Sequence, residues 1–345
     1  MKKYLFITIS AALALTACTN ETTEYVGDTQ AREIAFAPLA QKATRAAVNG
    51  TDFPTTNTME IAAYRASATA GNYFTKCTFS RQEITTGNYA WIDNTNHKYW
   101  PLSPIKLNFF AVSGAGLTNS HITIADDLST ASVAYTSSNY TTDIQSDIMY
   151  AFGRGEVTQA ADNSLNFNSG NNVTMVFNHT QAQVKFRIKA GNDATASAGL
   201  QITSITLNGA KYQGTLTLTN TNATTESSAV TTTVAWSSVS DAVATVNVPG
   251  FSSPHTLTTT FYPADNSANL LIIPGTGNGF TSFTINYTLG NNAYSYTYTP
   301  SPAIANAEVA KVYNYDITMT LHEITVNPSV TDWTDHATYT DVPVG

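Results

Sequence analysis

The sequence predicts an all-β protein built from two tandem β-sandwich domains of the transthyretin-like or Greek-key type. Three observations support this fold class. Short apolar segments with a two-residue alternation recur along the chain, and no ten-residue stretch keeps a helical period. Turn signals such as Asn208-Gly209, Pro274-Gly275 and Gly290-Asn291-Asn292 separate the later segments at the spacing of a sandwich.

The composition favours an extracellular protein and argues against a nucleic-acid partner. Hydrophobic residues make up 42% of the 345-residue chain, which is enough for a buried core. Charged residues make up 12%, about half of the roughly 25% that is typical of soluble proteins. The net charge is −8, whereas a nucleic-acid binder needs a basic patch.

The N-terminus has the pattern of an export signal. Lys2 and Lys3 precede a short apolar run over residues 4–15, too short to span a bilayer as a helix. The run ends in Leu15-Thr16-Ala17-Cys18, which resembles the lipobox of bacterial lipoproteins. That resemblance implies a signal peptide over residues 1–17 and acylation of Cys18, for example with palmitate, although a plain signal peptide with an incidental cysteine stays open.

Residues 18–45 are expected to form a tether followed by a removable strand. The segment from Ile34 to Ala40 is apolar throughout, with Ile34 and Phe36 on one face and Leu39 on the other if it is extended. A strand apolar on both faces belongs inside a sandwich. Pro38 cannot donate to a ladder, so we expect this strand at the edge of a sheet.

A basic run of small residues, Lys42 to Ala47, follows this strand directly. We expect it to be exposed and to be a good substrate for an arginine-specific protease, with cleavage between Arg45 and Ala46. A strand that fits a core and can be cut away suggests a removable plug.

The body of the chain is expected to divide into an N-terminal domain over residues 46–190 and a C-terminal domain over residues 191–345. The small, polar segment from Ala190 to Gly199 marks the boundary as a linker or long loop. The strand from Ala182 to Ile188 alternates apolar and basic residues, as a half-exposed strand does. The tail, His322 to Gly345, has apolar residues without a long continuous strand.

Several short motifs, in this order along the chain, make it similar to the fimbrillin-type proteins, the FimA-like and Mfa-like type V pilins of Bacteroidia. The motifs are the lipobox, the Lys-Ala-Thr-Arg45-Ala site, Tyr99-Trp100-Pro101, Asp147-Ile-Met-Tyr-Ala151, Phe177-Asn-His179 with Ala182-Gln-Val-Lys-Phe186, and Val330-Thr-Asp-Trp333.

This resemblance implies a structural subunit of a surface fimbrium that reaches the outer membrane as a lipoprotein. It implies cleavage after Arg45, loss of the first strand, and filling of the exposed groove by a C-terminal strand of another subunit. The implied partners are copies of the subunit, tip and anchor pilins, the protease and the outer membrane. The implied donor residues are Ile324, Val326, Trp333, Tyr339 and Val342.

The sequence predicts no catalytic residues, no metal and no cofactor. No Gly-x-Ser-x-Gly elbow occurs, and Gly275-Thr-Gly277-Asn-Gly279 is interpreted as a hairpin loop. The six histidines lack close metal-ligand spacing, and the pairs Asp143 with Asp147 and Asp332 with Asp335 are interpreted as solvated loop charges. Cys77 is expected to be a buried small apolar residue, with a reactive thiol as the alternative.

A monomeric glycan-binding or adhesin lipoprotein is the main alternative function. Tyr89, Trp91, Tyr99 and Trp100 could stack on sugars, although packing in a core is the commoner role of such residues. Arg45 separates the two hypotheses, because a pilin needs cleavage there and a glycan binder should keep its first strand.

Overall fold

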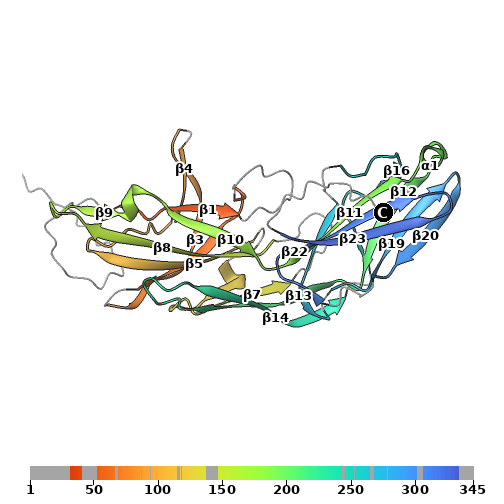
Figure 1. Ribbon diagram of the computed structural model, residues 1–345. Coiled ribbons are helices and arrows are strands. Elements are labelled where there is room, and N and C mark those ends of the chain that lie inside the picture. The colour runs from red at the N-terminus through yellow and green to blue at the C-terminus, as the bar shows by residue number, and fades with distance from the viewer. Residues whose placement is uncertain are drawn as a thin grey trace, which may run out of the picture.

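The structure, a computed structural model, is all-β apart from a few short helical turns over the residues that it describes, which confirms the all-β part of the predicted fold class. It describes residues 32–40, 53–66, 69–86, 88–93, 95–114, 117, 119–136, 147–242, 245–251, 253–264, 268–277, 279–300 and 306–333. Figure 1 shows an elongated molecule, with β3, β5, β8 and β9 toward one end and β12, β19 and β20 toward the other.

The first sheet contains eight strands in the order β10-β1-β4-β3-β2-β5-β8-β9. β10 also pairs with β8, so seven of these strands close into a ring. A ring of this kind leaves few open strand edges. The bounds are β1 (Phe36–Ala40), β2 (Met59–Arg65), β3 (Gly71–Thr85), β4 (Asn88–Ile92), β5 (Ile105–Ser113), β8 (Met149–Gln159), β9 (Leu165–Phe167) and β10 (Val173–His179), with the short 3-10 turn η2 (Asn168–Gly170) before β10.

A second sheet, in the order β14-β13-β7-β6, joins early and late parts of the chain. Its strands are β6 (Ile122–Ile124), β7 (Thr130–Thr136), β13 (Lys211–Thr221) and β14 (Thr231–Ala242), and the 3-10 turn η1 (Asn119–His121) leads into β6. β7, β13 and β14 lie along the underside of the molecule in Figure 1. The sequence pattern predicts neither β6 nor β7, because their apolar residues are interleaved with Ser, Thr and Ala.

A buried polar network fastens the β13–β14 connection to the first sheet. Asn108 on β5 is fully buried and donates to the carbonyls of Ala223 (2.7 Å) and Thr225 (2.8 Å). Arg154 on β8 donates to the Asn108 side-chain oxygen at 3.1 Å. Because buried polar groups need partners, these bonds fix how the second sheet lies on the first.

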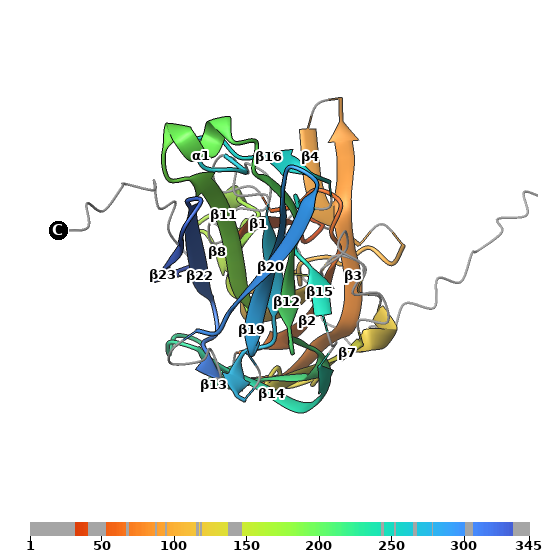
Figure 2. The ribbon, with the colours of Figure 1, turned by 90° about the vertical axis from the view of Figure 1, so that its right-hand side faces the viewer.

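The remaining strands form a two-sheet sandwich at the other end, seen from that end in Figure 2. One sheet has the order β17-β11-β22-β23, and the other has β15-β12-β19-β20 with β16 also on β12. The bounds are β11 (Ala182–Ala190), β12 (Gln201–Asn208), β15 (Thr245–Asn247), β16 (His255–Thr256), β17 (Asn269–Ile272), β19 (Ser282–Leu289), β20 (Asn292–Tyr298), β22 (Lys311–Met319) and β23 (Ile324–Asp332). The small strands β18 (Gly275–Thr276) and β21 (Asn306–Ala307) pair with each other.

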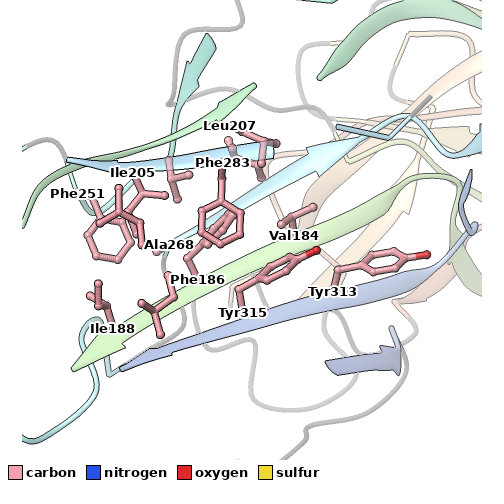
Figure 3. Close-up of a cluster of buried hydrophobic side chains, with 14 of the residues drawn as sticks. Val184, Phe186, Ile188, Ile205, Leu207, Phe251, Ala268, Phe283, Tyr313 and Tyr315 are labelled. Carbon is pink, nitrogen blue, oxygen red and sulfur yellow. The ribbon is translucent and has the colours of Figure 1, made fainter. Parts of the chain in front are cut away.

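Aromatic residues fill the core between these two sheets (Figure 3). Phe186 on β11 packs edge-to-face on Phe283 of β19, with ring centroids 5.0 Å apart, and stacks on Tyr315 of β22 at 5.4 Å. Val184, Phe186 and Ile188 share the inner face of β11, as the two-residue alternation predicts.

The sheets divide the chain differently from the expected boundary between residues 190 and 191. β11 precedes that boundary, yet it pairs with β17 and β22 of the sandwich. The segment that follows contains the short helix α1 (Asp193–Ser197), whose N-cap Asn192 accepts a hydrogen bond from the Thr195 backbone.

Three local expectations about the later strands are wrong. The outer face of β11 is not half-exposed throughout, because Gln183 and Lys185 are both buried there. The sequence also predicts a strand from Leu257 to Tyr262, but this segment is not a continuous strand and β16 ends at Thr256. The tail does contain a long strand, β23, whose polar residues Asn327 and Ser329 hide it from a search for apolar runs.

Candidate functional site

The side chains on one face of β1 belong to the core of the ring. Ile34 and Phe36 are 0% and 1% exposed, and Pro38 is buried as well. The Phe36 ring packs edge-to-face against Phe79 (4.9 Å between centroids) and Phe109 (5.2 Å). On the other face Leu39 is half-buried. β1 therefore covers aromatic side chains that water would otherwise reach.

The position that β1 occupies between β10 and β4 is called the β1 slot. β1 runs parallel to β10 over its whole length, from Phe36 opposite Val173 to Ala40 opposite Phe177. It also pairs antiparallel with β4 where Phe36 lies opposite Trp91. The prediction of a sheet-edge strand is therefore wrong.

Pro38 is tolerated because of the direction in which its missing amide would point. The Val173 amide donates to the Ala35 carbonyl at 2.9 Å, so residues 35, 37 and 39 direct their backbone groups toward β10. Residue 38 therefore faces β4, where the ladder is recorded only at Phe36. The proline therefore lacks an amide only on the side facing β4, where the ladder has already ended, and no hydrogen bond is lost.

The residues just before β1 are held as well. Ile34 donates its amide to the Lys98 carbonyl (2.7 Å), and the Trp100 amide donates to the Arg32 carbonyl (2.8 Å). Glu33 accepts at 2.7 Å from His97, which makes an ion pair when the histidine is protonated. Residues 32–34 are thus bonded to the segment between β4 and β5.

Two glycines on β8 make room for the side chains that lie beside the slot. A Cβ on Gly153 would lie 2.2 Å from Met175 Sδ, and a Cβ on Gly155 would lie 2.5 Å from the Trp100 ring. Real Cβ atoms do not approach so closely, so the ring can close around Met175 and Trp100 only if these positions lack side chains.

The first part of the tail lies on its own sandwich as β23. Among the strands that the structure describes, β23 pairs with β22 alone and is the outer strand of its sheet. Ile324 and Val326 are half-buried against the sandwich core, whereas Val330 is 57% exposed. The outer edge of β23 offers backbone groups for a further strand. Of the expected donor residues, Tyr339 and Val342 lie outside the described residues.

Trp333, the last described residue of the chain, is buried at 3% exposure and stacks on His179. The ring centroids are 3.9 Å apart and the planes differ by 5°. His179 Nδ1 lies 2.9 Å from Asp147 Oδ1, so the imidazole has a carboxylate as its hydrogen-bond partner. The sequence motifs contain both residues, but nothing in them indicates that the two rings meet.

The processing residues Cys18, Arg45 and Ala46 lie outside the described ranges, so their roles stay predictions. Cys77 is half-buried, and burial raises the pKa of its thiol to about 11. A thiol that stays protonated at neutral pH is a poor nucleophile, which favours a packing role for Cys77.

The aromatic residues considered for sugar stacking are split between core and surface. Trp91 and Trp100 are 7% and 4% exposed, whereas Tyr89 and Tyr99 are 47% and 44% exposed. The Tyr89 face is already occupied by the Arg81 guanidinium, 3.6 Å from the ring centroid. The four residues therefore do not form one aromatic platform.

Among the described residues, no group of three or more His, Cys, Asp or Glu side chains gathers in a way that could hold a metal ion. Asp332 forms an ion pair with Lys311, and Asp147 contacts His179. Within the same ranges, no helix combines the length and the apolar character that a membrane crossing requires.

The ring, the β1 slot and the docked Trp333 belong to an all-β fold. The chain belongs to the fimbrillin-like family, whose model matches residues 44–333, and this is a family of fimbrial structural proteins rather than of enzymes. A search of curated proteins gives no match.

Several solved structures resemble the chain. A candidate cell adhesion protein of Bacteroides ovatus matches with a TM-score of 0.50 and 14% identity, covering 88% of this chain and 98% of its own. A candidate cell adhesion protein of Bacteroides uniformis gives 0.48 and 18%, covering 88% and 99%. A fimbrial protein of Bacteroides vulgatus gives 0.46 and 15%, covering 88% and 100%. At these identities the likeness concerns the fold alone.

Proposed function

We propose that this protein is a structural subunit of a surface fimbrium that polymerises by exchanging strands at the β1 slot. The protein is exported as a lipoprotein on Cys18, reaches the outer membrane, and is cut between Arg45 and Ala46. β1 then leaves, and a C-terminal segment of another subunit takes its place. Membership in the fimbrillin-like family supports the subunit role.

The observation that carries this proposal is the way β1 is held. A short strand, joined to the body only through a cleavable basic run, fills a position in a closed ring and buries Phe36 against Phe79 and Phe109. Burial of an aromatic or large aliphatic side chain contributes about 1.5–3 kcal/mol. Vacating the slot would therefore expose an apolar surface with a strong tendency to be refilled.

The backbone of β10 gives the slot its direction and specificity. Five residues of β10, Val173 to Phe177, lie opposite β1 and would lose their ladder partner when it leaves. An incoming strand restores these hydrogen bonds, each of which contributes about 1 kcal/mol net. The slot and the tail are unlike surfaces at separate places on the molecule, so repeated exchange generates an open filament rather than a closed ring.

The donor segment is proposed to lie within residues 322–345. Trp333 is buried and the Ile324–Asp332 strand already pairs with β22, so the tail after Trp333 can act without unfolding the sandwich. Donation by Ile324 and Val326 themselves requires β23 to leave β22 first.

Treatment of the lipid-free protein with an arginine-specific protease tests the proposal. Cutting should produce ladders of SDS-resistant oligomers, and Arg45→Lys should abolish them, because it keeps the charge while removing the cleavable arginine. Arg81→Lys, at a surface arginine on β3, is the matched control and should polymerise normally. Cut protein that stays monomeric after losing residues 32–45 would contradict strand exchange.

A further inference from the structure

The strand that holds β1 also leads directly to the contact that holds the tail. β10 pairs with β1 through residues 173–177, and His179 follows only two residues after the last pair. His179 stacks on Trp333, after which residues 334–345 continue the chain. In Figure 1 the end of β10 lies near the middle of the molecule, beside the ends of β22 and β23.

His179 is held tightly at this junction. Its side chain is 2% exposed and contacts Asp147 at 2.9 Å. The Thr180 amide donates to the Ile148 carbonyl at 3.0 Å, and the Ile148 amide donates to Gln181 Oε1 at 2.9 Å. These bonds attach the end of β10 to Asp147 and Ile148, the two residues just before β8.

Trp333 is fastened to the same short stretch of chain. Its amide donates to the Ala310 carbonyl at 2.8 Å, and the Ala310 amide donates to the Gln181 carbonyl at 3.0 Å. The indole packs on Leu271 and Val312, but its buried nitrogen has no hydrogen-bond acceptor among the residues that the structure describes. A buried N–H without an acceptor weakens the docked state, so the tail is held by a contact that can be released.

We propose that β10 couples the two ends of the chain: while β1 occupies its slot, Trp333 stays docked on His179, and loss of β1 undocks it. The inference rests on the proposed function in one respect, the departure of β1. The coupling adds an autoinhibitory contact to the proposed function. In the uncut subunit Trp333 stays docked on His179, so the start of the tail is fixed and the subunit is a poor strand donor.

The physical reason is the pairing of β10. Residues 173–177 of β10 pair with β1. Among the described residues, β10 pairs with β8 only at Asn178 and His179. When β1 leaves, the segment immediately before His179 gains freedom. A ring stack with a 5° interplanar angle depends on the orientation of both rings, so this freedom weakens it.

Hydrogen exchange on monomeric protein tests the coupling directly. In a variant whose residues 41–50 carry the site of a non-arginine protease, cutting and removal of β1 should raise amide exchange across residues 329–333 by about tenfold or more. Dilute protein keeps oligomers out of the measurement. Unchanged exchange in protein that mass spectrometry shows to have lost β1 would overturn the coupling.

Substitutions distinguish loss of the ring stack between His179 and Trp333 from a general loss of stability. His179→Gln, in uncut protein, should raise exchange across residues 329–333, whereas His179→Phe should keep it low because the ring stack remains. His255→Gln is the matched control: this histidine also stacks on an aromatic ring, Tyr262 at 3.4 Å, but lies away from the junction. Equal effects of the variants at residues 179 and 255 would contradict the proposal.

Linkage requires the reverse effect, since coupling between two sites is reciprocal. Trp333→Ala in uncut protein should raise exchange across Ile34 to Ala40. Trp236→Ala, which removes a different indole whose nitrogen donates to the Thr180 carbonyl, should raise it less. A cut protein that undocks Trp333 without polymerising would refute the proposed function alone. A cut protein that polymerises with Trp333 still docked would refute the coupling alone.

Discussion

The five-residue strand β1 and the nine-residue strand β23 lie near opposite ends of the chain and are held in different ways. β1 has neighbours on both sides and one fully buried face. Among the described strands β23 has one neighbour, β22, and its side chains are half-buried or exposed. The strand proposed to leave is thus the better packed of the two, so its departure needs cleavage and a replacement, whereas the strand near the donor is already accessible.

The largest difference should appear when each strand loses its best-buried side chain. Phe36→Ala should lower the free energy of unfolding by about 3–5 kcal/mol, because it leaves a cavity beside Phe79 and Phe109. Val326→Ala on β23 should lower it by about 1 kcal/mol, since this side chain is only half-buried. Urea unfolding of the uncut protein measures both, and similar losses would remove the contrast between the strands.

Substitution of a glycine beside the β1 slot should cause the next largest loss of stability. Gly155→Ala should destabilise the protein by about 1–3 kcal/mol, because its Cβ would meet the Trp100 ring. Gly71→Ala is the control, since a Cβ there would meet nothing within 4 Å. Thermal unfolding should show a lower midpoint for the first variant only. Tolerance of a side chain at residue 155 would mean that the ring is looser than the structure indicates.

The sandwich that carries β23 should respond to pH through Lys185. Burial lowers the pKa of this lysine from 10.5 to about 8, and the unfolded chain keeps the higher value. Between these values the unfolded state binds more protons, so stability should rise as pH increases from about 8 to 10.5, by no more than about 3 kcal/mol. Urea unfolding at several pH values checks this, and Lys185→Met should flatten the dependence.

The smallest effect is expected at the exposed end of β23. Val330 is 57% exposed, so Val330→Thr should change the unfolding free energy by no more than about 0.5 kcal/mol. A larger loss, measured in the same urea titration, would show that β23 is held by contacts beyond its pairing with β22.

The sequence predicts the all-β class and most strands because two-residue alternation survives wherever one face of a strand is buried, as in β8 and β10. It predicts that residues 34–40 belong in a core, since every side chain there is apolar. It cannot show that β8 pairs with β10 and closes a ring, because that pairing depends on long-range geometry. For the same reason Pro38 suggests an edge, although β1 is paired on both sides.

The tail shows a second feature that the sequence pattern does not predict. β23 is held by backbone pairing to β22 more than by apolar side chains, so its composition resembles that of a loop. The stack of Trp333 on His179 joins residues far apart in sequence, and no local pattern encodes such a meeting.

The occupancy of the β1 slot can be measured at β10 itself. Cut protein freed of β1 should exchange the amides of Val173 to Phe177 rapidly, and a synthetic peptide of residues 322–345 should restore slow exchange there. A peptide with the same composition in scrambled order is the control. Rapid exchange that persists at saturating peptide would contradict the exchange of strands between subunits.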